Sequence, residues 1–402
     1  MNPKFSYGKI FAIGSGFFAI SVVWMVYNTF MPLILSEFIQ SSALRGAIMG
    51  LDNLLAVFLI PFIGVWSDRT STRFGQRLPF IVVGMPLAAL LVMLLPLSNG
   101  ALWTLLAVDV LFLLSMTVFR GPVIALMPDH TPPVKRSSAN GVINLMGGIG
   151  ALVALFVLGK LWDTHHAYPF LAAGAIMLLA FGFLFFAVDR RPPYAEPSTD
   201  DSESLGSFRQ NLSQLFSTEH RPQLYILIAI FLYFIGYAGV EAQFSTYAVH
   251  HLGVTGGQAA TALGFFSLSF VLFALPAGFV GTKIGKANAM KIGLILMPAT
   301  FVLIPFFSSL TIIKVLLLLG GIGWALINVQ AYPLVADLGG KQRIGLFTGM
   351  YYFFSMGSSI VAPFLLGLVM DFLSYPALYY VGSASVLLGL WFLHTGVKKL
   401  SV

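Results

Sequence analysis

Long apolar runs separated by short polar stretches continue along the whole chain. A helix that crosses the roughly 30 Å hydrocarbon layer of a bilayer needs about 20 apolar residues. The pattern predicts twelve such helices, over residues 8–34, 44–66, 79–98, 101–126, 138–160, 168–188, 223–249, 258–281, 288–308, 311–334, 344–370 and 376–396. The predicted fold class is therefore all-α integral membrane. The first helix is longer than the apolar part of a signal peptide, so we expect it to be retained.

The segment 189–222 interrupts this pattern because it is polar. It divides the chain into a predicted N-terminal six-helix bundle (1–188), a cytoplasmic linker (189–222) and a C-terminal six-helix bundle (223–402). Four apolar residues of the linker share one face of a possible helix lying on the membrane surface: Phe208, Leu212, Leu215 and Phe216. A loosely ordered loop is the alternative.

The two predicted bundles share a sequence repeat. Gly64 has a counterpart 214 positions later, at Gly278. Four further pairs are 208 positions apart: Arg120 and Asn328, Asp129 and Asp337, Gly159 and Gly367, Asp163 and Asp371. Pairs at one spacing predict two pseudo-symmetric six-helix bundles that arose by duplication.

Composition shows which solvent surrounds these helices. Charged residues make up 9% of the chain, against about 25% in soluble domains, and the mean hydropathy is +0.89. So few charges cannot cover a water-facing surface, and the helices must face lipid. The chain has no cysteine, which excludes disulfides and thiolate metal sites. The net charge of +7 does not indicate nucleic-acid binding, because its meaning depends on where the charges fall.

The basic residues collect on one side of the predicted membrane. All but four of the 22 Lys and Arg residues lie in the stretches on the side of the N-terminus. The exceptions are Arg45, Lys160 and Lys314 on the opposite side, and Arg120 within a helix. The positive-inside rule then predicts a multi-pass protein of the plasma (cytoplasmic) membrane with both termini in the cytoplasm.

One basic loop carries a motif between the second and third predicted helices. Its marked residues are Gly64, Asp68, Arg69, Arg73, Gly75 and Arg77. The loop resembles the signature loop of the major facilitator superfamily. The spacing S-D-R-x-x-x-R-x-G-x-R-x-P-F, together with the run from Arg120 to Asp129, resembles the branch of glycoside–pentoside–hexuronide and sucrose symporters. The resemblance implies that the loop gates the transporter by tying helix 2 to helix 11. The alternative is that its arginines only determine topology.

Ionisable residues inside membrane helices are costly and mark function. Four lie well inside the predicted helices: Asp52, Asp109, Arg120 and Glu241. Asp109 and Arg120 are eleven residues apart, so they share one helix face about 16 Å apart along the axis. We expect Asp52, Asp109 and Glu241 to be candidates for coupling a proton or sodium ion. Arg120 is a candidate for binding substrate, and a structural ion pair is its alternative.

Amide and aromatic side chains complete the predicted substrate site. In the superfamily that this chain resembles, helices 1 and 7 flank the central cavity, which implies that Asn28, Glu241 and Gln243 face substrate. Amides donate and accept hydrogen bonds as a polyol requires, and aromatic rings can stack on a sugar. The remaining candidates are Asn144, Asn328 and Gln330, with Trp24, Tyr27, Tyr237 and Trp324. For any one aromatic residue, contact with lipid is the alternative.

These observations predict a proton-coupled or sodium-coupled importer of a sugar or glycoside that works by alternating access, as a monomer and without a cofactor or a bound metal. The main alternative is a proton-coupled exporter of drugs or other metabolites. An integral-membrane enzyme would show a compact group of His, Asp or Glu at one membrane face, and a sensor would carry an added signalling domain. We expect neither here. The pairs His165–His166 and His250–His251 fit interfacial histidines better than a zinc site.

Overall fold

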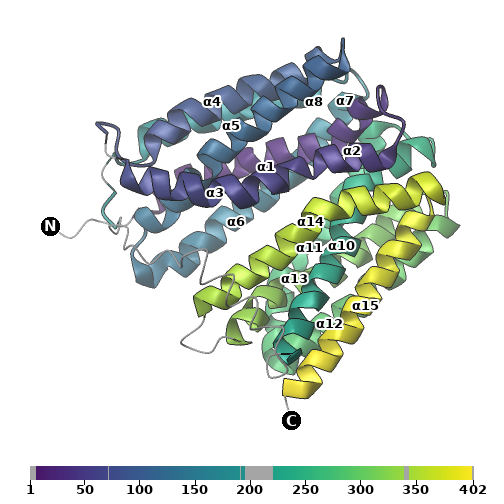
Figure 1. The fold of residues 1–402 in the computed structure, drawn as a ribbon. Helices are drawn as coiled ribbons and strands as arrows, with labels where there is room; N and C mark the ends of the chain where they lie inside the picture. Colours follow the sequence, from purple (N-terminus) through teal and green to yellow (C-terminus); the bar gives the residue numbers. More distant parts are fainter. Residues whose placement is uncertain (1–5, 71, 191, 195–220, 339–343, 401–402) are drawn as a thin grey trace. The chain divides into compact units, whose positions relative to one another are not determined.

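The computed structural model describes residues 6–70, 72–190, 192–194, 221–338 and 344–400. Within these ranges the regular structure is helical, apart from a single bridge between Thr72 and Gly75. Figure 1 shows long helices throughout both parts of the chain. The predicted surface helix around Leu212 falls outside the described residues.

The first half of the chain forms α1 to α8. Their bounds are α1 (Tyr7–Ser36), α2 (Ser42–Met49), α3 (Leu51–Arg69), α4 (Leu78–Leu94), α5 (Leu102–Asp129), α6 (Arg136–Val153), α7 (Gly159–Trp162) and α8 (Tyr168–Ala187). Short turns complete them, namely η1 (Leu95–Ser98), η2 (Pro133–Lys135) and the π-helical turn η3 (Ala154–Leu158).

The second half forms α10 to α15. Their bounds are α10 (Arg221–His250), α11 (Gly256–Ile284), α12 (Lys286–Leu303), η5 (Ile304–Phe306), α13 (Leu310–Leu338), α14 (Ile344–Phe372) and α15 (Ala377–Leu400).

Twelve helical segments of the described residues are long and apolar enough to cross a membrane, which confirms the predicted all-helical membrane class. Two predicted helices are interrupted. The second is broken at Gly50 between α2 and α3, and the fifth contains the π-helical turn η3 between α6 and α7. α5 continues through Pro122 within its bounds.

The chain divides into two compact units. Unit 1 contains residues 1–38, 54–199 and 255–261, and unit 2 contains residues 39–53, 200–254 and 262–402. Each unit therefore includes a short piece from the other half of the sequence. In unit 1, α1 packs against α6 and α8, and α4 packs against α5 and α8. In unit 2, α10 packs against α14 and α15, and α12 packs against α13 and α15.

Glycines allow some of these helices to approach closely, as small residues do in membranes. A Cβ atom added to Gly150 of α6 would lie 2.4 Å from the carbonyl oxygen of Phe18 in α1. One added to Gly321 of α13 would lie 2.3 Å from the carbonyl oxygen of Phe266 in α11. Larger side chains at these positions would separate the helices.

Candidate functional site

An aromatic cluster in unit 1 holds the predicted substrate-binding arginine. Trp24 and Tyr27 of α1 lie with their ring centroids 5.7 Å apart, and Phe112 of α5 lies 6.0 Å from Trp24 and 5.2 Å from Tyr27. The guanidinium carbon of Arg120 lies 5.7 Å from the Trp24 ring. A cation over an indole face is attracted by the ring, so this cluster positions a half-buried positive charge beside aromatic surface.

Asp109 lies on the same helix, one turn before Phe112, and is fully buried. Asn28 of α1 is half-buried, one residue after Tyr27. Asn144 of α6 is exposed, and its side-chain nitrogen donates to the carbonyl of Asn140 at 2.9 Å. The structure therefore places Asp109 in the interior of unit 1 and Asn144 on its surface.

A second aromatic cluster surrounds Glu241 in unit 2. Tyr237 stacks on Trp324 with centroids 3.6 Å apart and planes 12° apart, and Phe266 lies 5.8 Å from Tyr237. The Tyr237 hydroxyl hydrogen-bonds to the Glu241 side chain one helical turn away. The space lined by Glu241 and its apolar neighbours is about 10 Å³, which is room for no more than one water. Glu241 thus sits in a tight aromatic environment with one hydroxyl partner.

Gln243 and Gln330 are buried. The side-chain NH2 group of each donates hydrogen bonds to the backbone. Gln243 Nε2 donates to the carbonyl of Ser42 at 3.1 Å and to that of Pro363 at 2.8 Å. Gln330 Nε2 donates to the carbonyl of Ala277 at 2.8 Å. These two predicted substrate ligands hold helices together here, so we leave them out of the proposed binding set.

Asp52 and Asn328 are half-buried members of unit 2. The side-chain nitrogen of Asn53 donates to Asp52 Oδ1 at 2.7 Å. Asn328 lies one helical turn after Trp324 on α13, so it shares a face with the Glu241 cluster.

The predicted gating loop contains a partly buried ion-pair network. Arg77 forms an ion pair with Asp68, its Nε donates to Asp129 Oδ2 at 3.0 Å, and its terminal nitrogen donates to Ser67 Oγ at 2.6 Å. Asp68 and Arg69 are in the last turn of α3, where the helix dipole favours the arginine and disfavours the carboxylate. Arg77 offsets that effect and joins the ends of α3 and α5. The predicted tie between helix 2 and helix 11 stays a prediction.

Gly75 has a structural reason for its place in the loop. Its φ is +86°, and an added Cβ would lie 2.0 Å from the carbonyl oxygen of Arg190. Gly64, by contrast, has nothing within 4 Å of an added Cβ. Arg73 is exposed, with its guanidinium carbon 4.8 Å from the Phe74 ring. The loop is therefore held by Gly75 and Arg77, while Arg73 stays at the surface.

The sequence repeat returns as a repeated contact. Asp337, the counterpart of Asp129, accepts a hydrogen bond from Lys286 Nζ at 2.5 Å. Lys286 begins α12, just as Arg77 directly precedes α4. In each unit, a basic residue at the start of one helix thus binds the carboxylate at the end of the next helix along the chain.

His130 is absent from the predicted site residues, because a lone His at a helix end has no spacing that marks it. It is buried directly after α5, with Nδ1 2.9 Å from the carbonyl of Leu126. Its Nε2 accepts from the backbone N–H of Asp189 at 3.2 Å, and Asp189 is ion-paired with Lys9. Nδ1 must then carry the proton. Burial lowers the pKa of His130 from 6.5, although Leu126, Asp189 and Asp129 act in the opposite direction.

Two carboxylates cap helix starts far away in the sequence. In unit 2, Asp371 at the end of α14 accepts from Ser41 Oγ at 2.6 Å, Ser42 N at 2.8 Å and Ala43 N at 3.0 Å. In unit 1, Asp163 after α7 accepts from Thr255 Oγ1 at 2.8 Å and Gly257 N at 3.0 Å. The spacing of 208 residues marks these two aspartates as counterparts in the sequence. It does not predict which residues they bind.

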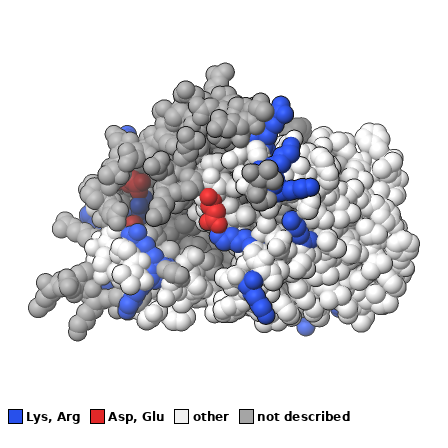
Figure 2. All heavy atoms as spheres, turned by 90° about the horizontal axis from the view of Figure 1, so that it is seen from below, with Lys and Arg blue, Asp and Glu red and all other residues white. Residues whose placement is uncertain are grey.

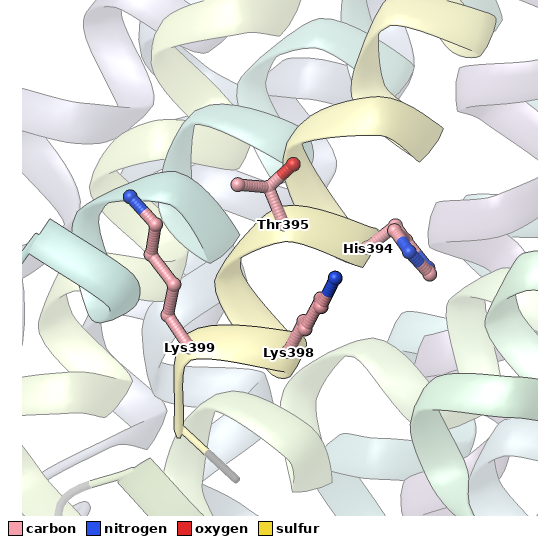
Figure 3. A pocket seen from close by; sticks show the side chains of 4 residues that line it. All are labelled: His394, Thr395, Lys398 and Lys399. Carbon is pink, nitrogen blue, oxygen red and sulfur yellow. The ribbon is translucent and has the colours of Figure 1, made fainter. Parts of the chain in front are cut away.

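A hollow of about 510 Å³ lies near the end of α15. It is lined by His394, Thr395, Lys398 and Lys399 (Figure 3). The helix dipole favours lysines in a last turn, and Lys399 Nζ lies 4.8 Å from the Tyr225 ring. We assign no ligand to this hollow.

Figure 2 shows a face on which Lys and Arg side chains are numerous and acidic ones few.

The described residues contain no group of three or more His, Asp or Glu that could hold a metal. His166 stacks on Trp162 with centroids 4.1 Å apart, and His165 lies 5.1 Å from Tyr168. The His251 ring lies 5.1 Å from Tyr247. These histidines pack against aromatic rings at helix ends.

The described residues contain twelve helices long and apolar enough to cross a membrane, which indicates a multi-pass membrane protein. A sequence model of the family described as MFS/sugar transport protein matches residues 12–400, so the chain belongs to this family.

The relatives differ in the function that their names give. The tetracycline resistance protein, class B, of Escherichia coli is 25% identical over 346 residues, 84% of this chain and 82% of that protein. The isoprimeverose transporter of Lactiplantibacillus pentosus is 24% identical over 325 residues, 73% of this chain and 62% of that protein. The crystal structure of the nucleoside transporter NupG has a TM-score of 0.77 at 12% identity, covering 97% of this chain and 99% of that one. At this identity the structural likeness shows the fold alone.

Proposed function

We propose that this transporter is a proton-coupled symporter that imports a sugar or glycoside by alternating access. The two six-helix bundles, 1–188 and 223–402, would rock around a central site, joined by the linker 189–222. The excess of basic residues on one side supports a plasma-membrane protein with both termini in the cytoplasm. The proposal treats the protein as a monomer.

The observation that carries the proposal is the pair of aromatic clusters, each holding one ionisable side chain. Trp24 supports Arg120 in unit 1, and Tyr237 with Trp324 surrounds Glu241 in unit 2. Aromatic faces beside charged and amide groups suit a polyol with apolar ring faces. The similarity to an isoprimeverose transporter points to the same substrate class.

Within this proposal the ionisable residues have separate roles. Arg120 with Asn28 and Asn328 would bind substrate hydroxyls, and Asp109, Glu241 or Asp52 would carry the proton. A buried carboxylate such as Asp109 is costly when charged, so proton binding and substrate binding can favour each other. Asp109→Asn is expected to abolish accumulation and spare exchange. Loss of both activities would indicate a structural role for Asp109.

The test is uptake by proteoliposomes of labelled mono- and disaccharides, with and without an inward proton gradient. Accumulation of one sugar that the gradient stimulates is the expected result. The alternative is an exporter of drugs or metabolites, which the likeness to a tetracycline resistance protein favours. Proton-driven movement of a lipophilic cation, with no transport of any sugar, would establish that alternative.

A further inference from the structure

A hollow of about 470 Å³ lies in unit 2, where the start of α2 meets the end of α14. We call it the α2–α14 hollow. Both helices belong to segments that can cross a membrane, and each has one end at this place. The hollow therefore lies at one face of the membrane, where the hydrocarbon layer gives way to the lipid headgroups.

One wall of the α2–α14 hollow is apolar. Phe364, Leu368 and Phe372 follow at intervals of four residues, so they share one face of α14. Leu44 of α2 completes this wall. Leu44 is 56% exposed and Phe372 is 81% exposed. Because lipid tails are as apolar as a leucine side chain, this wall suits an acyl chain.

The polar wall of the hollow has a carboxylate that can accept another hydrogen bond. An ionised carboxylate offers about four lone-pair sites. The described residues fill three of those sites on Asp371, through Ser41 Oγ, Ser42 N and Ala43 N. Asp371 is exposed and lines the hollow. A donor in the hollow can therefore bind to it, and a cationic donor binds most strongly.

A positive charge is buried close behind the polar wall. Arg45 is 3% exposed, and its guanidinium donates to the carbonyls of Ile39 at 2.8 Å and Gln40 at 3.3 Å and to Ser42 Oγ at 3.0 Å. Gln40 is exposed and lines the hollow, and a side-chain amide can donate to an anionic oxygen. The polar wall thus offers an acceptor for a cation beside a donor for an anion.

We propose that the α2–α14 hollow binds a phospholipid whose headgroup ends in a primary ammonium group, as in phosphatidylethanolamine. The ammonium donates to Asp371, and the phosphate accepts from Gln40. One acyl chain lies along the apolar wall. A choline headgroup has no N–H to donate, and a headgroup with a net negative charge is repelled by the carboxylate.

The bound lipid contacts both helices, so it adds to the bonds that hold the start of α2 against the end of α14. This inference concerns the lipid at the surface of unit 2 and does not depend on which cargo the protein carries.

The test uses the full chain with one bimane fluorophore on Leu365→Cys. The chain has no natural cysteine, and Leu365 is exposed between two residues of the apolar wall. The protein is placed in phosphatidylcholine vesicles that contain a minor fraction of a lipid with brominated acyl chains, which quench the fluorophore on contact. Brominated phosphatidylethanolamine is expected to bind about fivefold more tightly than brominated phosphatidylcholine or phosphatidylglycerol, the ratio that one exposed charge pair supplies.

Two variants and a second label position serve as controls. Asp371→Asn keeps an acceptor oxygen but removes the charge, and it is expected to abolish the preference. Asp337→Asn changes a helix-end carboxylate that does not line the hollow, and it is expected to keep the preference. A label on Ala384→Cys, exposed about two turns inside α15 as Leu365 lies about two turns before the end of α14, is expected to show no preference.

Equal binding of the three brominated lipids at Leu365→Cys would overturn the proposal. This comparison keeps Asp371 unaltered, so its result does not depend on how a variant folds. The same preference at Ala384→Cys, or a preference that survives Asp371→Asn, would also overturn it. Loss of the quenching on addition of glycerophosphoethanolamine, which has the headgroup without acyl chains, would show a water-soluble ligand in place of a lipid.

Discussion

The carboxylate of Asp371 should decide how firmly the start of α2 is held. It accepts one hydroxyl and two backbone hydrogen bonds, at 2.6, 2.8 and 3.0 Å. The two N–H groups belong to the first turn of α2 and have no partner within that helix. Loss of a cap costs about 0.5–2 kcal/mol, and a hydrogen bond to a charged group contributes about 1.5–3 kcal/mol. Because Asp371 is exposed to solvent, we expect Asp371→Ala to cost only about 2 kcal/mol in total.

That free energy corresponds to a roughly 30-fold larger population in which the start of α2 is undocked. Because the chain has no cysteine, a single introduced cysteine can report this population by its rate of chemical labelling. Ser42 is 1% exposed, so a Ser42→Cys background reacts with a maleimide only when this segment opens. Asp371→Ala should raise the labelling rate about 30-fold, and Asp371→Asn, which keeps an acceptor oxygen, only about fivefold.

Asp337→Ala is the control for this measurement. It also removes a helix-end carboxylate of unit 2. Asp337, however, lies at the end of α13 and binds Lys286 at the start of α12. We expect it to leave the labelling rate of the Ser42→Cys background unchanged. If Asp371→Ala labels no more than about twofold faster than that background, the cap does not hold the start of α2, and the hydrogen-bond argument is refuted.

Two further predictions concern the segments that follow α3 and α5. His130 has its pKa lowered by burial, so the unfolded chain takes up its proton first and stability falls as the pH drops below 6.5; His130→Gln should flatten this part of the melting temperature plotted against pH, and an identical profile would contradict it. Gly75→Ala should destabilise the protein by more than about 1 kcal/mol, because its φ of +86° and the Arg190 carbonyl exclude a Cβ. Gly64→Ala, where a Cβ meets nothing within 4 Å, should change the melting temperature little.

The sequence by itself determined the membrane helices and the side on which the charges collect. The length of an apolar run is a local property that the bilayer thickness selects, so twelve helices and the family resemblance could be predicted residue by residue. Spacing along the chain also predicted that Arg120 and Asp109 would lie inside the helices. It marked Asp163 and Asp371 as a repeated pair, because duplication leaves equal offsets.

Only the tertiary structure decided which partner each of these groups has. The bonds between Asp371 and the start of α2 join residues more than 300 positions apart. The amide side chains of Gln243 and Gln330 have the chemistry of substrate ligands. In the folded chain, however, their nitrogens donate to backbone carbonyls of neighbouring helices. The buried position of His130 likewise depends on contacts between elements. Periodicity places a side chain on a face of its own helix, but the neighbouring helix determines what that side chain meets.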